Sequence, residues 1–121
     1  MYYFLVCFYI LDYCFWSHTD RYAMMHTDDL GALLGTMSPD LLVDGKPIDQ
    51  AVLEDWNEMF HYVPNSDSEW IDIIDEFLDY YEKNEGFDFP LARTILREDF
   101  VLTYVPTAKE KAKETCNQHN Y

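Results

Sequence analysis

The N-terminal segment constrains the fold more than any other part of the chain, because residues 1–16 are apolar or aromatic except for one acid, Asp12. A run of this kind is stable in water only where another part of the structure buries it. Its Tyr, Phe, Val and Ile content favours a strand, whereas its length favours a buried helix. We expect a helix over residues 2–16 that continues through 17–22.

The same segment has some features of an export signal or a membrane anchor. However, no basic residue precedes the apolar run, no small-residue cleavage site follows it, and it is too short and too aromatic to cross a bilayer. We therefore expect a core element and no membrane partner, with an interfacial anchor as the alternative. Its aromatic side chains could equally be buried against a second copy, so a homodimer stays open.

The three cysteines are odd in number and show no CxxC spacing, which argues against a disulfide framework. Cys7 and Cys14 are seven residues apart, on one face of a helix. Free thiols in such positions behave as small buried apolar groups, and burial makes them poor nucleophiles. We expect reduced, inert cysteines and a cytoplasmic location.

The rest of the chain favours an all-α fold of four to five helices, packed as a single bundle-like domain over residues 1–106. Apolar residues at helical spacing predict helices over 30–37, 50–62 and 69–83. A shorter helix is expected over 91–100, where Arg93 and Arg97 are four residues apart.

Polar and small residues mark the beginning of the helix over 30–37. Thr27 is expected to be its N-cap, with Asp28 and Asp29 in the first turn, where carboxylates favour the positive end of the helix dipole. Gly31 and Gly35 each cost about 1 kcal/mol of helix stability relative to alanine. We therefore expect these two glycines to let another helix approach closely.

Three signals define the second half of the chain. Ser66 or Ser68 is expected to cap the helix over 69–83, and Gly86 to end it. Residues 101–105 are rich in side chains that favour strands, so a short extended segment is expected there. Residues 107–121 alternate Lys and Glu and have little to bury, which predicts a polar tail that is a frayed helix or disordered.

The chain is strongly acidic, with 23 Asp and Glu against 8 Lys and Arg and a net charge of -15. Seventeen of the acids lie between Thr27 and Asp88, where Lys46 and Lys83 are the only bases. Such a surface repels phosphate backbones and anionic lipids. We expect no nucleic-acid partner and a cationic protein partner, with solubility alone as the alternative role of the charge.

The sequence contains no motif for nucleotide binding, no nucleophilic-serine elbow and no zinc-protease motif. His26, Asp28 and Asp29 form the nearest metal-like cluster, but adjacent carboxylates diverge on a helix and helix capping accounts for them. We expect no catalytic residue, no metal and no cofactor. An enzyme with an unrecognised carboxylate site is a further alternative.

A row of carboxylates along residues 69–83 is the main candidate for a partner-binding site. The row lies opposite the apolar stripe of the expected helix, so we expect it to be solvated. Tyrosine supplies large, rigid contact area at protein interfaces. The candidate partner-binding residues are Asp72, Asp75, Glu76, Asp79, Tyr80 and Glu82.

Residues 27–37 read Thr-Asp-Asp-Leu-Gly-Ala-Leu-Leu-Gly-Thr-Met, and Asp-Gly-Lys-Pro at 44–47 and Asp-Trp at 55–56 follow. This pattern resembles one in small acidic bacterial immunity proteins encoded beside polymorphic or contact-dependent growth inhibition toxins. The resemblance implies an inhibitor that acts by binding a cognate toxin domain, which is basic and of nuclease type, and implies no enzymatic activity. The scaffold residues that it implies are Thr27, Asp28, Asp29, Gly31, Gly35, Met37, Asp44, Gly45, Pro47, Asp55 and Trp56.

The alternative to the immunity function is an acidic adaptor or regulatory interaction domain that inhibits no toxin. The two classes share an acidic binding surface and differ in what the bound partner does. The genomic neighbourhood separates them, since an immunity gene lies beside a toxin gene.

Overall fold

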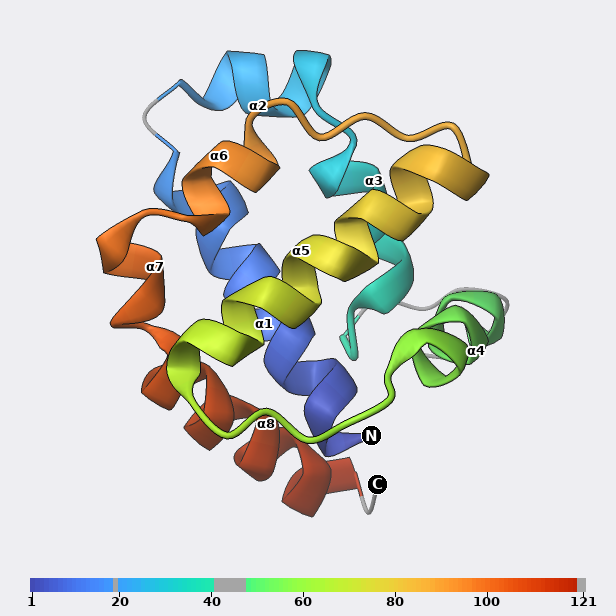
Figure 1. Cartoon of the computed structure of the whole chain (residues 1–121), viewed down its shortest axis with the longest axis vertical. Helices are drawn as coiled ribbons and strands as arrows, with labels where there is room; N and C mark the ends of the chain where they lie inside the picture. The colour runs from blue at the N-terminus through green and yellow to red at the C-terminus, as the bar shows by residue number, and fades with distance from the viewer. Residues whose placement is uncertain (19, 41–47, 120–121) are drawn as a thin grey trace.

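A computed structural model describes residues 1–18, 20–40 and 48–119, and these residues form an all-α fold without strands (Figure 1). The helix count is higher than expected, because short helices lie between the long ones. The helices are α1 (Tyr2–Ser17), α2 (Arg21–Thr27), α3 (Leu30–Met37), α4 (Gln50–Met59), α5 (Asp67–Asn84), α6 (Ala92–Leu96), α7 (Asp99–Leu102) and α8 (Val105–His119).

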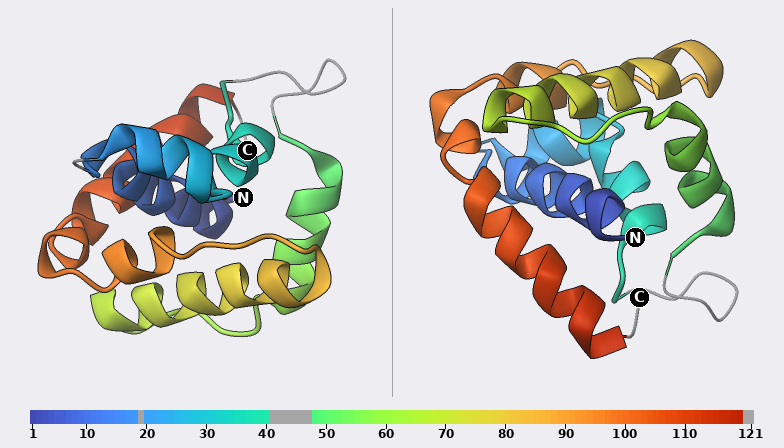
Figure 2. Two further views of the ribbon diagram at one scale, coloured as in Figure 1. Left: turned by 90° about the horizontal axis from the view of Figure 1, so that it is seen from above. Right: turned by 60° about the horizontal axis from the view of Figure 1, so that its bottom comes forward.

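Helix α1 is the central element of the fold and lies between α5 on one side and α8 on the other (Figure 2). It is buried around most of its circumference by helices of the same chain, which explains why its sequence shows no amphipathic periodicity. The helical prediction for this segment is confirmed. Its buried residues are Phe4, Leu5, Val6, Cys7, Phe8, Ile10, Leu11, Cys14 and Phe15.

The expected continuation of this helix through residue 22 is wrong. Helix α1 ends at Ser17, and His18 has extended backbone angles. Asp20 then begins α2 as its N-cap, where the carboxylate accepts a hydrogen bond from the Ala23 backbone N–H at 3.0 Å. A capping acid inside a polar stretch therefore starts a new helix.

The two cysteines of α1 are buried free thiols, as expected. Burial raises the pKa of Cys14 to about 12 and raises that of Cys7 well above its usual range. Both groups are therefore thiols at neutral pH and poor nucleophiles. None of the helices in the described ranges is both long and apolar enough to span a membrane.

The structure of the C-terminal part of the chain differs from two predictions. Residues 101–105 are not extended, because α7 and the start of α8 occupy them. Residues 107–119 are not a polar tail, because α8 packs along α1 and the hydroxyls of Tyr9 and Thr115 share a hydrogen bond. The buried face of α8 consists of Val105, Ala108, Ala112 and Thr115.

The domain therefore continues past residue 106 to the end of α8. Two further contacts hold this helix in place. The rings of Tyr13 and Tyr104 stack with their centroids 3.8 Å apart, and Lys109 pairs with Asp67 of α5 at 3.2 Å. The buried side chains of α8 are small, so the apolar stripe that normally reveals a packed helix is absent from the sequence.

Helix α5 forms as expected, over a slightly longer range. Ser66 is its N-cap and accepts a hydrogen bond from the Glu69 N–H at 3.2 Å. Gly86 follows its C-terminus with φ of 72°, a left-handed conformation that glycine adopts without steric cost. Helix α4 ends at Met59, short of the expected residue 62.

Asp29, expected in the first turn of α3, is the N-cap residue of that helix, and Thr27 and Asp28 also differ from the expected capping. Thr27 is the last residue of α2, and its hydroxyl donates to the Ala23 carbonyl. Asp28 is buried and accepts hydrogen bonds from the backbone N–H groups of Leu30, Leu91 and Ala92, at 2.8, 2.9 and 3.0 Å. Asp28 thus joins the start of α3 to the start of α6, two segments about sixty residues apart.

The remaining scaffold residues other than Asp55, which lies in α4, divide into three groups. Trp56 and Met37 lie in the core. A Cβ at Gly31 would lie 3.2 Å from the Phe15 ring, which confirms a close approach to α1, whereas one at Gly35 would meet no described atom within 4 Å. Asp44, Gly45 and Pro47 fall outside the described residues.

Candidate partner-binding site

The row of carboxylates on α5 faces two arginines of the α6 region. Arg93 Nε donates to Asp75 at 2.8 Å, and its Nη1 bonds both Asp79 and Glu82. Arg97 bonds Asp72 at 2.6 Å and Asp75 at 3.0 Å. Asp75, Asp79 and Glu82 are partly buried by these contacts, so the expectation of a solvated row is wrong for them. Asp72 and Glu76 are exposed as expected, and Glu76 is the member that neither arginine bonds.

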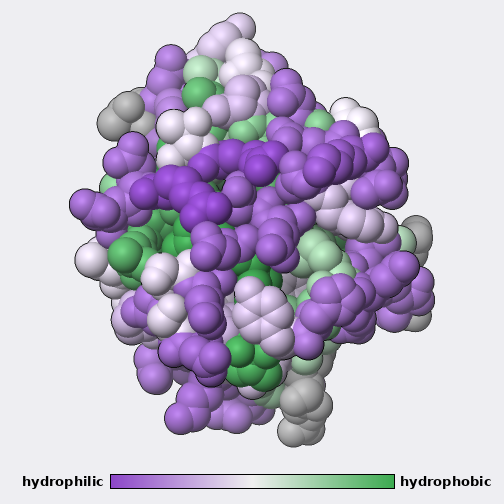
Figure 3. Space-filling view, viewed as in Figure 1, coloured by the Kyte–Doolittle hydropathy of each residue, from purple (hydrophilic) through white to green (hydrophobic). Residues whose placement is uncertain are grey.

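Hydrophilic side chains form a band over α5 and α6 on this face of the molecule (Figure 3). The arginines in this band neutralise much of the acidic charge of α5. Burial alone would raise the pKa of Asp75, but hydrogen bonds from Arg93 and Arg97 outweigh burial and hold that pKa below its usual range. The pKa of Asp79 is also lowered, first by Lys83 and then by Arg93.

We expect the Arg93→Leu substitution to lower the free energy of unfolding at pH 7 by about 1 to 2 kcal/mol, a value reduced for partial exposure. A lowered carboxyl pKa contributes stability above its ordinary value of 3.8, and this contribution is lost as the pH falls through the native pKa. The difference between wild type and variant should therefore shrink below about pH 4.

Urea unfolding at pH 7, 5, 4 and 3 measures this difference. Lys113→Met is the matched control, because Lys113 is exposed and takes part in no salt bridge among the described residues. A difference between wild type and Arg93→Leu that stays constant from pH 7 to pH 3 would contradict the electrostatic origin of the effect.

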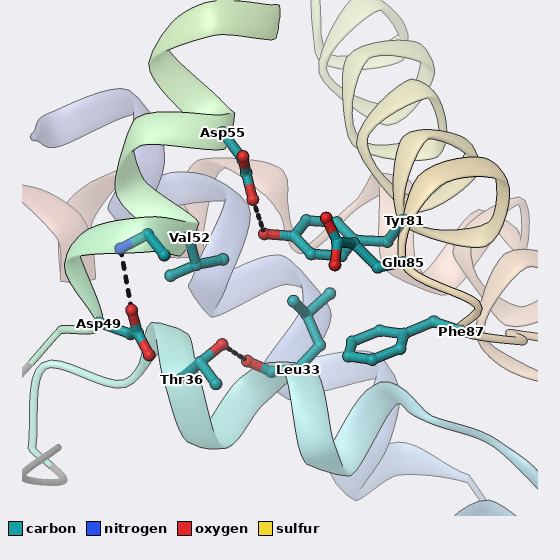
Figure 4. A pocket seen from close by; sticks show the side chains of 9 residues that line it. Leu33, Thr36, Asp49, Val52, Asp55, Tyr81, Glu85 and Phe87 are labelled. Carbon is teal, nitrogen blue, oxygen red and sulfur yellow. Dashed lines mark hydrogen bonds between the residues drawn. The ribbon is translucent and has the colours of Figure 1, made fainter.

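A second acidic region lies on another side of α5, where α3, α4 and the chain after α5 surround a cleft of about 280 Å³ (Figure 4). We call it the acidic cleft. Its carboxylates come from three places: the N-cap of α4, the middle of α4, and the residue that follows α5. Its lining residues are Leu33, Thr36, Asp49, Ala51, Val52, Asp55, Tyr81, Glu85 and Phe87.

Hydrogen bonds and aromatic contacts hold the acidic cleft in shape. The Tyr81 hydroxyl donates to Asp55 Oδ2 at 2.7 Å and so joins α5 to α4. The Asp49 carboxylate accepts from the Ala51 N–H at 2.8 Å as the N-cap of α4. The rings of Tyr81 and Phe87 stack at 5.5 Å. The lining is therefore positioned by the fold in the absence of a ligand.

The pKa values of two tyrosines at the acidic cleft are raised, partly by the nearby carboxylates. Burial, followed by the hydrogen bond to Asp55, raises the pKa of Tyr81. The pKa of the neighbouring Tyr80 is raised first by the Asp55 charge and further by Glu58 and Glu85. No described lysine or arginine side chain forms a salt bridge with Asp55, Glu58 or Glu85.

The expected site residues thus fall into two separate places. Tyr80 interacts with Asp55 beside the acidic cleft, whereas Asp72 and Asp75 lie on the arginine side of α5. Glu85 and Phe87 were not among the expected site residues, although both follow a Tyr-Tyr pair near the end of the longest helix.

Within residues 1–18, 20–40 and 48–119, no group of three or more His, Cys, Asp or Glu side chains is placed to hold a metal ion. What the acidic cleft provides is a concave surface with negative charge and aromatic walls, which is suited to binding a cationic group.

No protein-family model, curated protein or solved structure matches this chain. Its function is therefore inferred from its own residues and geometry.

Proposed function

We propose that this protein is an immunity protein that binds and neutralises a basic toxin domain. The observation that supports it best is the acidic cleft, whose carboxylates have no described base of the chain as a partner, while those on the other side of α5 are paired internally. The sequence pattern over residues 27–56 also supports this proposal.

The arrangement suits an inhibitor that must bind its target quickly. Complementary charge raises association rates to about 10⁸ M⁻¹s⁻¹ or more at low salt. Tyr80, which is half-buried, adds rigid aromatic contact area beside the carboxylates, and tyrosine is a residue that carries much of the affinity at protein interfaces. The proposed inhibition needs only binding and uses no chemistry of this chain.

The direct test is co-expression with the toxin domain encoded by the neighbouring reading frame. We expect growth to be rescued and the two proteins to co-purify in equal amounts. Absence of both rescue and co-purification would overturn the proposal. Co-purification without rescue would favour the adaptor function instead.

A kinetic experiment locates the binding surface. Glu58→Gln together with Glu85→Gln removes two exposed charges near the acidic cleft, and we expect the association rate at low salt to fall about three- to tenfold. Glu110→Gln together with Glu114→Gln on α8 is the matched control, because it changes the net charge equally elsewhere. Equal rates for the two double variants would contradict binding at the acidic cleft.

A further inference from the structure

The acidic cleft combines an apolar interior with a charged rim. Leu33 and Val52 lie almost fully buried beneath the cleft, Ala51 and Phe87 contribute accessible apolar surface, and Phe87 points toward Leu33 (Figure 4). Its volume of about 280 Å³ lies just below the range for ligand pockets, which begins at about 300 Å³. The cleft therefore suits one long side chain, not a folded segment of a partner.

The acidic residues at the opening of the cleft determine which charge a bound side chain should carry. Asp49, Asp55 and Glu85 belong to different parts of the fold and line one opening. Each carboxylate offers about four acceptor sites, and the hydrogen bonds to Asp49 and Asp55 described above use only part of them. An anionic or purely apolar group would leave these charges without a partner, whereas a cation with several donors would satisfy them.

We propose that the acidic cleft receives one arginine side chain of the partner. This inference rests on the proposed function, because it assigns the part of a basic partner that enters the site. A guanidinium is planar and stacks on aromatic faces such as that of the half-buried Phe87, and its five N–H donors can reach carboxylates in different directions. A lysine ammonium is a compact, strongly hydrated charge with none of this planarity.

The test uses the isolated full-length protein and two peptides of equal charge, acetyl-(Gly-Arg)₃-amide and acetyl-(Gly-Lys)₃-amide, followed by ¹⁵N NMR titration. We expect the arginine peptide to bind about three- to fivefold more tightly and to shift the amides of Ala51, Val52 and Phe87. Equal affinity for the two peptides, or shifts spread evenly over all acidic surfaces, would overturn the proposal.

A variant that fills the cleft separates its shape from its charge. Ala51 is exposed and lines the opening, so Ala51→Phe occupies the cleft while every carboxylate remains. We expect it to weaken the arginine peptide about fivefold and to remove the preference for arginine over lysine. Asn57→Phe, at an exposed position of α4 outside the lining, is the matched control and should leave binding unchanged.

The outcomes distinguish this inference from the proposed function. If Ala51→Phe binds the arginine peptide as tightly as wild type, the arginine site is overturned even where the toxin domain is still neutralised. If the arginine peptide binds in the cleft but the toxin domain is not neutralised, the arginine site is supported and the immunity function fails.

Discussion

Ala108→Glu is expected to lower the free energy of unfolding by about 3 to 5 kcal/mol, because the new carboxylate would be buried without a partner. Ala108 is fully buried on the face of α8 that packs along α1. Small domains have a total stability of roughly 5 to 15 kcal/mol. Urea unfolding followed by circular dichroism should show a much lower midpoint, or a chain that is already partly unfolded in buffer.

Thr107→Glu is the matched control for this prediction. It places the same charge one residue earlier, at an exposed position of the same helix, and we expect a change within about 0.5 kcal/mol. If both variants were as stable as wild type, α8 would be the polar tail that the sequence alone suggests. A large loss in Ala108→Glu alone would establish that α8 is part of the core.

Asp28→Ala is expected to lower the free energy of unfolding by about 3 kcal/mol, because three backbone N–H groups would lose a charge-assisted hydrogen bond in a buried place. Asp28 is 7% exposed, so water cannot readily replace the carboxylate. Asp28→Asn should also be destabilising, because both carboxylate oxygens accept from backbone N–H groups. The asparagine NH₂ group would replace one of these oxygens and place a donor against a donor. Urea unfolding measures each change.

The neighbouring aspartate provides the control. Asp29 also bonds the segment before α6, but it accepts a single hydrogen bond, from the Asp88 N–H at 2.8 Å, in an exposed place. We expect Asp29→Ala to cost about 1 kcal/mol or less. Equal losses of unfolding free energy for Asp28→Ala and Asp29→Ala would show that the buried hydrogen bonds of Asp28 stabilise the fold no more than the exposed hydrogen bond of Asp29.

Helix α5 could be predicted from the sequence because it carries large apolar side chains and a local signal at each end. Helix α5 has its stripe, its Ser66 cap and its Gly86 stop within twenty residues of one another. Helix α8 could not be recognised in this way, because Ala108 and Ala112 bury little area and their burial depends on α1, nearly one hundred residues away.

The candidate site was only partly predictable for a similar reason. Acidic spacing on α5 identified a charged helix, but the pairing of Asp75 and Asp79 with Arg93 depends on how α6 folds back across α5. The acidic cleft combines residues from α3, α4 and α5, and only the tertiary fold brings Asp49 and Glu85 to the same opening. Tyr80 was the one expected contact residue on that side.

The acids bonded to Arg93 and the acids near the acidic cleft differ in how freely each can be replaced during evolution. Asp75, Asp79 and Glu82 share one guanidinium, so replacing any of them disturbs the partners of the others, and viable changes there have to occur together. Glu58 and Glu85 are exposed and have no such shared partner among the described residues. A lineage can therefore alter the charge pattern around the acidic cleft one residue at a time while the helical scaffold stays the same.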